Sequence, residues 1–149
     1  MPIIQRVGFT GTQKGMSVYQ NSALRMELYV YRYPNSEFHH GDCFGADEQA
    51  HAIARELGLK IMLHIPVNAI NRAFCEGDET FGPLPYLDRN EEIVKCTDIL
   101  IATPFEVIEQ LRSGTWFTIR CARKRRSPII IIQPDGTRLR EPSIGRVVS

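Results

Sequence analysis

Short apolar runs alternate along the chain with segments whose apolar residues recur at helical spacing. Runs at 3–9, 37–40, 60–65, 99–102 and 129–132 predict strands, and the later ones are continuous rather than alternating. Continuous apolar runs are typical of strands that are buried on both faces of a parallel sheet. The pattern therefore predicts an α/β fold, a Rossmann-like three-layer αβα sandwich with a mainly parallel sheet of about five strands.

The segments between the first three runs predict two helices. Ser17 and Gln20 have the spacing of a capping box, in which each side chain satisfies a backbone amide of the other residue, and Pro34 ends the helix that they begin. Residues 46–57 carry the clearest amphipathic pattern of the chain, and Gly58 stands where a glycine commonly ends a helix.

The second half of the chain predicts two more helices and two stretches without them. Asp88 has the position of a helix N-cap, and a last helix is expected over about 116–125. Residues 66–85, which contain three prolines and two glycines, predict a long loop of the kind that often carries function. We expect a single domain over 1–149, with a core over about 3–132 and a polar tail, 133–149, that packs late or lies loose.

Composition excludes several classes of protein. With 149 residues, of which 43% are hydrophobic and 23% charged, the chain is long enough for a packed core. The net charge of +1 gives no global attraction to nucleic acid. No apolar run is long enough to span a membrane and no signal peptide is recognisable, which predicts a cytoplasmic protein. The four cysteines form no C-x-x-C pair and predict reduced, mainly packing thiols.

Three glycine-bearing loops follow predicted strands, and each precedes a predicted helix. Ligands of open parallel sheets bind at the carboxyl ends of the strands, and free amides at helix starts attract phosphate. Each loop alone could also be an ordinary turn or cap, and Asp47 could simply favour the helix dipole; taken together, the loops predict a ligand site. Its candidates are Gly11, Thr12 and Lys14; Gly41, Asp42, Gly45, Ala46 and Asp47; and Ser113, Gly114 and Thr115.

Other polar residues leave alternatives open. Arg89 and Asn90 open a helix beside the long loop, where the arginine could pair with phosphate or face solvent. His40 could serve as an acid or base or hold a structural hydrogen bond, and no metal site is predicted. The basic cluster Arg123–Arg126 lies at a helix end, where cations are favoured, so its role as a nucleic-acid patch is left open.

The order of these motifs is similar to that of a known family. Gly-Thr after the first strand, the segment His40–Asp47 (H-G-D-C-F-G-A-D), the Arg89–Asn90 pair, the strand at 99–102 and the late Gly114–Thr115 resemble the SLOG superfamily. This superfamily groups the DNA-processing protein A fold with the cytokinin-activating LOG enzymes. Within it, the chain is most similar to the YspA-like SLOG domains of bacteria and their phages, over roughly residues 5–132.

The resemblance implies a Rossmann-like fold that binds nucleotides or ligands derived from them. Carried over by motif, it assigns ligand contacts to Gly11, Thr12, Gly41, Asp42, Gly45, Ala46, Asp47, Arg89, Asn90, Gly114 and Thr115. LOG enzymes carry the motif P-G-G-x-G-T-x-x-E, whose glutamate serves catalysis. Here Thr118 stands at that position, which argues against LOG-type phosphoribohydrolase activity.

These observations favour a domain that binds a nucleotide or nucleotide-derived ligand at the carboxyl edge of the sheet, as a sensor or a processing domain. The alternative is a hydrolase of N-glycosidic bonds that uses Asp42 or Asp47, with His40 as a further catalytic candidate; a second alternative is single-stranded nucleic-acid binding. No cofactor is expected to be required beyond the nucleotide-like ligand. A homo-oligomer, dimer or tetramer, is left open, nucleic acid is the less favoured partner, and no membrane contact is expected.

Overall fold

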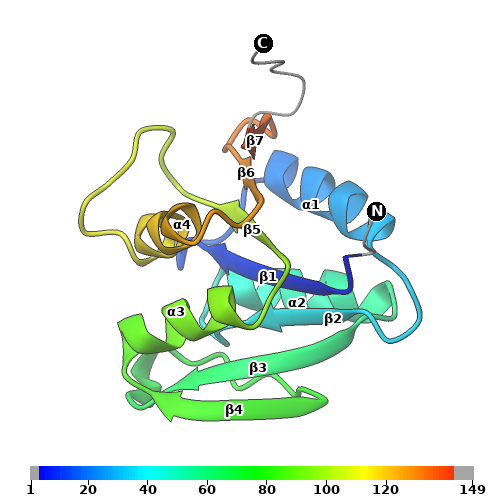
Figure 1. Ribbon diagram of the computed structural model, residues 1–149, viewed down its shortest axis with the longest axis vertical. Helices are drawn as coiled ribbons and strands as arrows, with labels where there is room; N and C mark the ends of the chain where they lie inside the picture. Colours follow the sequence, from blue (N-terminus) through cyan, green and yellow to red (C-terminus); the bar gives the residue numbers. More distant parts are fainter. Residues whose placement is uncertain (1–3, 143–149) are drawn as a thin grey trace.

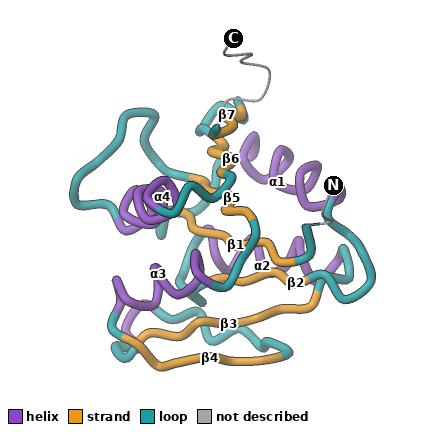
Figure 2. Tube along the Cα trace, viewed as in Figure 1, coloured by secondary structure: helices purple, strands orange, loops and turns teal. Residues whose placement is uncertain are grey.

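The computed structural model describes residues 4–142, which form one seven-stranded sheet between two layers of helices (Figures 1 and 2). The strands are β1 (Arg6–Gly11), β2 (Glu37–His40), β3 (Lys60–Pro66), β4 (Glu79–Leu84), β5 (Ile99–Thr103), β6 (Ile129–Ile132) and β7 (Arg138–Glu141). The helices are α1 (Val18–Val30), α2 (Ala46–Glu56), α3 (Tyr86–Lys95) and α4 (Gly114–Lys124), with a short 3-10 turn, η1 (Ala69–Asn71). The predicted α/β class and layering are confirmed.

The sheet reverses its direction of growth next to its first strand. Its strand order is β4-β3-β2-β1-β5-β6-β7, so β1 pairs in parallel with both β2 and β5. The chain builds outward from β1 to β4 and then crosses back to place β5 on the other side of β1. In open parallel sheets, such a switch point opens a crevice at the carboxyl ends of the strands.

Helices cover both faces of the sheet, and each pair of helices packs over its own core. On one face, α1 and α2 bury Phe9 and Phe38 in the larger apolar cluster. On the other face, α4 lies beside α3 and packs Trp116 and Ile119 against β5 and β6 (Figure 1). Strands β5 and β6 are buried throughout, which explains why their continuous apolar runs predict strands so clearly.

One strand lies inside the segment that the sequence predicts to be a loop. Residues 79–84 form β4, which pairs in parallel with β3 at the edge of the sheet. An edge strand has one row of backbone groups without a strand partner and therefore tolerates Pro83. Five of its six residues are exposed, so β4 carries no apolar run by which the sequence could reveal it.

A second unpredicted strand, β7, lies in the stretch expected to be a loose tail. It pairs antiparallel with β6, Ile132 opposite Arg138. The side chains of Arg138 and Arg140 reach the buried carboxylate of Glu27 on α1, with distances of 3.4 and 2.6 Å to Oε1. Charge pairing rather than apolar burial therefore holds β7 against the helix layer. The rest of the predicted tail, 143–149, lies outside the described residues.

One predicted helix start is confirmed and two are shifted. The predicted capping box at Ser17 and Gln20 is present at the start of α1, with both reciprocal bonds at 3.0 Å. Helix α3, however, begins at Tyr86 after Pro85 rather than at Asp88, which lies in its first turn. Helix α4 begins two residues earlier than expected, at Gly114, because the Ser113 side chain accepts the amide hydrogen of Trp116.

Candidate functional site

The main cavity of the protein opens at the carboxyl edge of the sheet. It measures about 580 Å³, a size typical of small-molecule sites. Segments that follow each of the first five strands contribute to it, so the cavity lies at the switch point. Its lining residues are Gly11, Thr12, Gln13, Lys14, Cys43, Pro66, Asn68, Ile70, Asn71, Tyr86, Phe105, Glu106, Arg112, Ser113, Gly114 and Thr115.

The start of α4 lies at this cavity. Ser113 caps the helix, accepting from Trp116 N at 3.2 Å, and its carbonyl accepts from Phe117 N. The amides of Gly114 and Thr115 belong to the first helical turn, which has no acceptors of its own, and both residues line the cavity. A Cβ at Gly114 would overlap the Tyr86 hydroxyl. Glycine therefore lets the aromatic ring close over this helix end.

The charged residues of the cavity wall favour an anion. Lys14 and Arg112 are its two cations and Glu106 is the one acidic residue among the described residues that line it. The Lys14 ammonium lies 4.1 Å from the centroid of the Phe105 ring, a cation–π contact that links the loop after β1 to the loop after β5. Together with the helix dipole of α4, this surplus of positive charge favours an anionic group over a cationic one.

Close packing around Gly11 joins the first loop to its neighbours. A Cβ on Gly11 would overlap the Thr103 hydroxyl on β5 and the Ala46 methyl on α2. Thr12 then bonds to both neighbours: its amide donates to Thr103 O at 3.1 Å, and its carbonyl accepts from Ala46 N at 3.0 Å. The loops after β1, β2 and β5 are therefore held in one arrangement at the floor of the cavity.

The carboxylate of Asp47 organises its own loop. Its Oδ2 accepts the amide hydrogens of Gly41 at 3.2 Å and Cys43 at 3.1 Å. Burial raises the pKa of Asp47 to about 6, although the nearby Arg89 guanidinium and these two amides act against the rise. Gly45 adopts a φ of +78°, and a side chain there would overlap the Gln13 carbonyl. The loop is thus shaped by contacts within the chain.

Asp42 holds a different part of the cavity wall. Its carboxylate accepts from Arg72 Nε and from the Cys75 amide, each at 2.8 Å, while its carbonyl accepts from the Ala73 amide at 2.8 Å. These bonds fix residues 72–75 directly after η1, whose Ile70 and Asn71 line the cavity. Asp42 is fully buried and bonded within the chain, and does not face the cavity.

Arg89 is buried, 2% exposed, against Gly41 in the loop that follows β2. Its guanidinium donates to the carbonyls of Gly41 and His64 and to Asn90 Oδ1, the last at 2.7 Å. These bonds tie the end of β2 to β3 through the side chain of Arg89. The cation predicted to meet phosphate is therefore placed behind the wall of the cavity.

The structure divides the thirteen predicted ligand contacts into two groups. Six line the cavity: Gly11, Thr12, Lys14, Ser113, Gly114 and Thr115. Seven do not: Gly41, Asp42, Gly45, Ala46, Asp47, Arg89 and Asn90. The second group shapes the loops on which the first depends.

Sequence reasoning missed the side chains that close the cavity. Tyr86 and Phe105 supply its aromatic surface, Arg112 a cation and Glu106 its carboxylate. No spacing marks these residues, because Tyr86 follows the exposed strand β4 and the other three lie in the irregular loop between β5 and α4. Arg112 stands directly before the Ser-Gly-Thr helix start, and a cation beside a predicted phosphate site was the one signal that could have found it.

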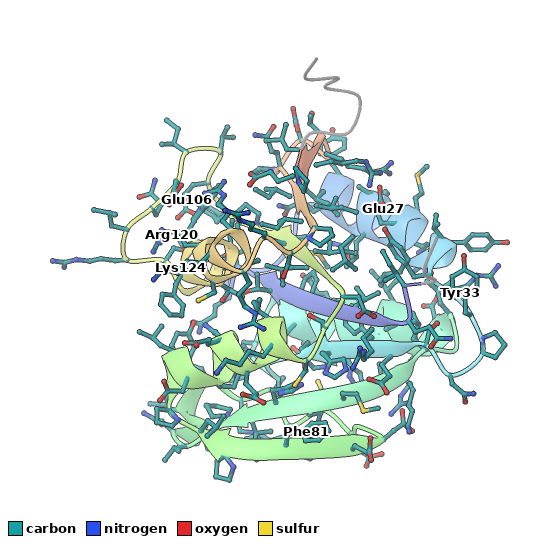
Figure 3. The ribbon with its side chains drawn as sticks, viewed as in Figure 1. Glu27, Tyr33, Phe81, Glu106, Arg120 and Lys124 are labelled. Atoms are coloured by element: carbon teal, nitrogen blue, oxygen red, sulfur yellow. The ribbon has the colours of Figure 1, made fainter. Side chains whose placement is uncertain are left out.

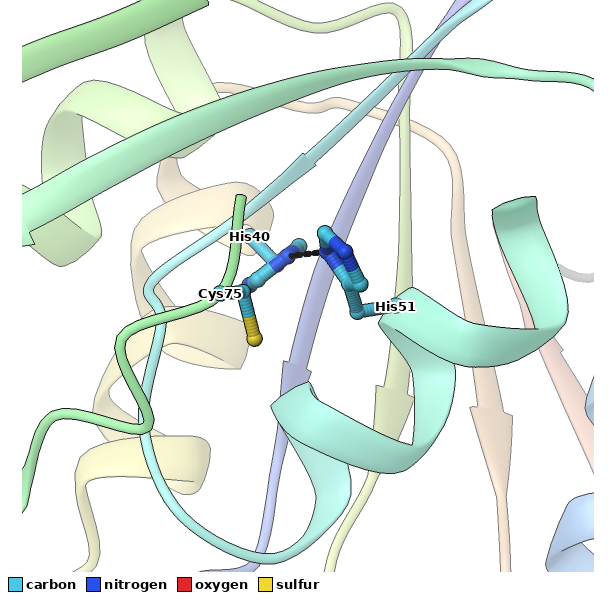
Figure 4. A group of neighbouring side chains, drawn as sticks. All are labelled: His40, His51 and Cys75. Carbon is cyan, nitrogen blue, oxygen red and sulfur yellow. Dashed lines mark hydrogen bonds between the residues drawn. The ribbon is translucent and has the colours of Figure 1, made fainter. Parts of the chain in front are cut away.

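His40, His51 and Cys75 form a cluster outside the cavity lining, with ligand atoms that all lie within 4.8 Å of one another (Figure 4). The Asp42 amide donates to His40 Nδ1 at 3.0 Å, so the ring proton is on Nε2, which lies 2.9 Å from His51 Nδ1. A histidine that binds metal normally donates its second ring nitrogen instead. Burial also raises the pKa of the Cys75 thiol to about 12. The cluster fits a hydrogen-bonded structural role for His40 better than a metal site.

The basic residues of α4 are partly neutralised. Arg120 and Arg123 each pair with Glu109 at 2.9 Å, and Arg123 also pairs with Glu141 at 2.8 Å. Lys124, Arg125 and Arg126 remain exposed at the end of the helix (Lys124 is labelled in Figure 3). The free positive patch is therefore smaller than the predicted cluster.

Several solved structures share the architecture of this chain. No protein-family model matches the chain, and no curated protein matches it in sequence. By structure it is similar to a molybdenum cofactor binding protein from the phototrophic bacterium Rippkaea orientalis, with a TM-score of 0.67 and 18% identity over 87% of this chain and 77% of that one. The molybdenum cofactor carrier protein of Chlamydomonas reinhardtii gives 0.62 and 16%, over 86% and 76%. DNA processing protein A of Streptococcus pneumoniae gives 0.62 and 17%, over 86% of this chain and 50% of that one.

The chain has a SLOG-type fold. The resemblance stated from its motifs is thereby confirmed at the level of the fold. The same similarities contradict the prediction that no cofactor is required, because two of these SLOG-type structures belong to proteins named for binding or carrying the molybdenum cofactor. That prediction is wrong. No helix among residues 4–142 has the length and apolar character needed to cross a membrane.

Proposed function

We propose that this protein binds a phosphate-bearing, nucleotide-derived ligand in the cavity at the carboxyl edge of its sheet, as a sensor or processing domain. The observation that supports this most directly is the start of α4, where Gly114 and Thr115 line the same cavity as Lys14 and Arg112 and have first-turn amides without a helical acceptor. Helix amides and basic side chains that converge on one cavity form a phosphate site.

The apolar part of the cavity lining suits a planar ring. Tyr86, Ile70 and Phe105 give it apolar and aromatic surface, and Asn68 and Asn71 add amide groups. Asn68 Oδ1 already accepts from the Ile70 amide at 3.1 Å, which leaves its NH₂ group to donate to a ligand. Flat heterocycles with acceptor atoms at one edge match this combination of stacking surface and donors.

Proteins of the same fold support a small-molecule role. Two of the similar structures are named for the molybdenum cofactor, and a third for DNA processing. In this chain Arg120 and Arg123 are paired with carboxylates. A small-molecule ligand therefore agrees better with the cavity than a nucleic-acid strand does. The cytoplasmic location and the homo-oligomer stay predictions.

The hydrolase alternative loses the carboxylates on which it depended. Asp42 and Asp47 are bonded within the chain and do not line the cavity, whereas Glu106 does. Cleavage of an N-glycosidic bond in this cavity would therefore need Glu106, and the release of free base should stop in Glu106→Gln and continue in Asp47→Asn.

The test is calorimetric titration with AMP, GMP, UMP and CMP. We expect the best of these to bind the parent protein, and Arg112→Ala and Lys14→Ala each to weaken its binding about tenfold or more, as expected for a charge-assisted hydrogen bond worth about 1.5–3 kcal/mol. The control is Lys124→Ala, an exposed cation at the far end of α4, which should leave the affinity unchanged. No binding of any monophosphate at millimolar concentration, or equal losses in all three variants, would refute the proposal.

A further inference from the structure

Helix α1 is apolar on two faces. Its inner face buries Leu24 and Leu28 in the larger core, where the helix packs against α2 and β6. Its outer face points away from the sheet (Figure 1). This outer face carries five large apolar side chains, each between 58% and 73% exposed: Val18, Tyr19, Met26, Tyr29 and Val30. Because a helix that is apolar all round is normally buried, we expect another surface to cover the outer face of α1.

The outer apolar face is continuous and large. At about 3.6 residues per turn, its five side chains and the exposed Ser22 fall within about a third of the helix circumference. They present on the order of 500 Å² of surface, near the upper end of the largest apolar patches on monomeric proteins. A stable interface of standard size needs about 800 Å² from each partner. The outer face of α1 is therefore large enough to form the apolar centre of such an interface, with its edges supplying the remainder.

The charged residues near this face lie at its edges. Arg25 pairs with Glu56 on α2 at 2.6 Å, and Arg138 on β7 pairs with Glu27 at 3.4 Å. Glu27 is the one acidic residue of α1 and is 4% exposed, while Arg32 stacks on an aromatic ring of the face at 3.6 Å. An apolar centre with a charged rim is typical of protein interfaces. Because two of the three cations are neutralised within the chain, charge offers little attraction for an acidic partner.

The residues of the outer face follow nearly the same order in both directions. From its first residue to its last, the face reads Val-Tyr-Ser-Met-Tyr-Val, and positions 18 and 30, 19 and 29, and 22 and 26 lie symmetrically about residue 24. Two identical copies related by a two-fold axis use the same surface on both sides. Antiparallel pairing about residue 24 therefore sets valine against valine, tyrosine against tyrosine, and the small Ser22 against the long Met26.

We propose that the outer face of α1 binds a second copy of the chain, with the two α1 helices antiparallel about a two-fold axis at residue 24. None of the residues on this face lines the ligand cavity, so the inference is independent of the proposed function. It assigns the predicted homo-oligomer to one surface, a dimer through α1.

Sedimentation velocity from micromolar to submillimolar concentration measures the association. The parent should reach twice the mass of the chain, and Met26→Glu should weaken the dimer at least tenfold, because it buries a charge at the centre of the interface. The control is Val67→Glu, which should leave the dimer unchanged: Val67 is as exposed as Met26, 63% against 62%, but follows β3. Circular dichroism checks that both variants fold. A monomeric parent, a dimer that Met26→Glu leaves intact, or equal losses in both variants would overturn the inference.

A mixture of two variants tests the antiparallel register. Ser22→Lys alone should also weaken the dimer, because it places a charge at the same centre. An equimolar mixture of Ser22→Lys and Met26→Glu should associate about fivefold or more tightly than either variant alone, since antiparallel pairing sets the new cation against the new carboxylate and keeps one parental contact. In a parallel pair the two new charges would not meet. A mixture that associates no better than the separate variants therefore refutes the proposed pairing.

Discussion

Replacing Asp47 by asparagine should remove a specific part of the pH dependence of stability. The side chain is 5% exposed, and its Oδ2 accepts the Gly41 and Cys43 amide hydrogens. Burial raises its pKa from 3.8 to about 6. At 1.36 kcal/mol for each pKa unit, the difference between the folded and unfolded states corresponds to about 3 kcal/mol. An amide oxygen at the Oδ2 position keeps both backbone bonds and does not titrate in this range.

The sign follows from proton linkage. A carboxyl group whose pKa is higher in the folded state binds its proton more tightly when the protein is folded. That stabilisation is present in full below the unfolded pKa of 3.8, and it is lost as the pH rises to about 6. Relative to Asp47→Asn, the parent should therefore lose about 3 kcal/mol of unfolding free energy across this window and no more above it.

Urea denaturation from pH 4 to pH 8 measures this difference directly. Burial lowers the pKa values of His39, His40 and His64, and these groups also change stability in this range. Their contributions cancel when the variant is subtracted from the parent. A difference that stays flat, or that grows in favour of the parent as the pH rises, would refute the reasoning. Ligand affinity should stay within a few-fold, because Asp47 does not line the cavity.

Three further substitutions test the packing around the site. Gly114→Ala should lower stability by about 1–3 kcal/mol and weaken monophosphate binding, because its methyl group would overlap the Tyr86 hydroxyl. Adding Tyr86→Ala should recover stability in a urea melt, and no recovery would contradict the overlap. Gln20→Leu should cost about 2–4 kcal/mol in the same assay, since its buried amide donates to two backbone carbonyls; a cost below 1 kcal/mol would mean that water replaces these bonds. Arg140→Ala should cost about 1–3 kcal/mol and speed hydrogen exchange in β7 by removing the closer partner of Glu27, and Glu27→Gln in that background should restore part of the loss.

The fold could be predicted where burial leaves a periodic or continuous apolar pattern. Residues 129–132 are all isoleucine and all buried, and α2 buries one regular stripe. Strand β4 is exposed and contains Pro83, and β7 is polar and held by the carboxylate of Glu27, so neither has an apolar signature. Strands stabilised by a sheet edge or by charge pairs depend on contacts between residues distant in sequence, and local patterns do not record these.

The site could be predicted in its backbone and in one of its two cations, Lys14. Gly114 and Thr115 follow from the rule that helix starts bind anions, and the structure places them in the cavity. The more specific motif, His40–Asp47, shows where the loops are fixed rather than where the cavity is lined: Asp47 accepts backbone amides and Asp42 accepts from Arg72. A distinctive sequence motif indicates a loop whose conformation requires particular residues. The three-dimensional structure is needed to show whether its side chains face a ligand or bond within the chain.

The central claim is that phosphate binds at the start of α4. Titration of ¹⁵N-labelled protein with the best monophosphate, followed by amide chemical shifts, tests it most directly. The account predicts that the Gly114 and Thr115 amide signals move most, in proportion to saturation, and that they move much less in Arg112→Ala at the same subsaturating ligand concentration. Large shifts centred on the Asp42 and Asp47 amides, with those of Gly114 and Thr115 unchanged, would contradict it.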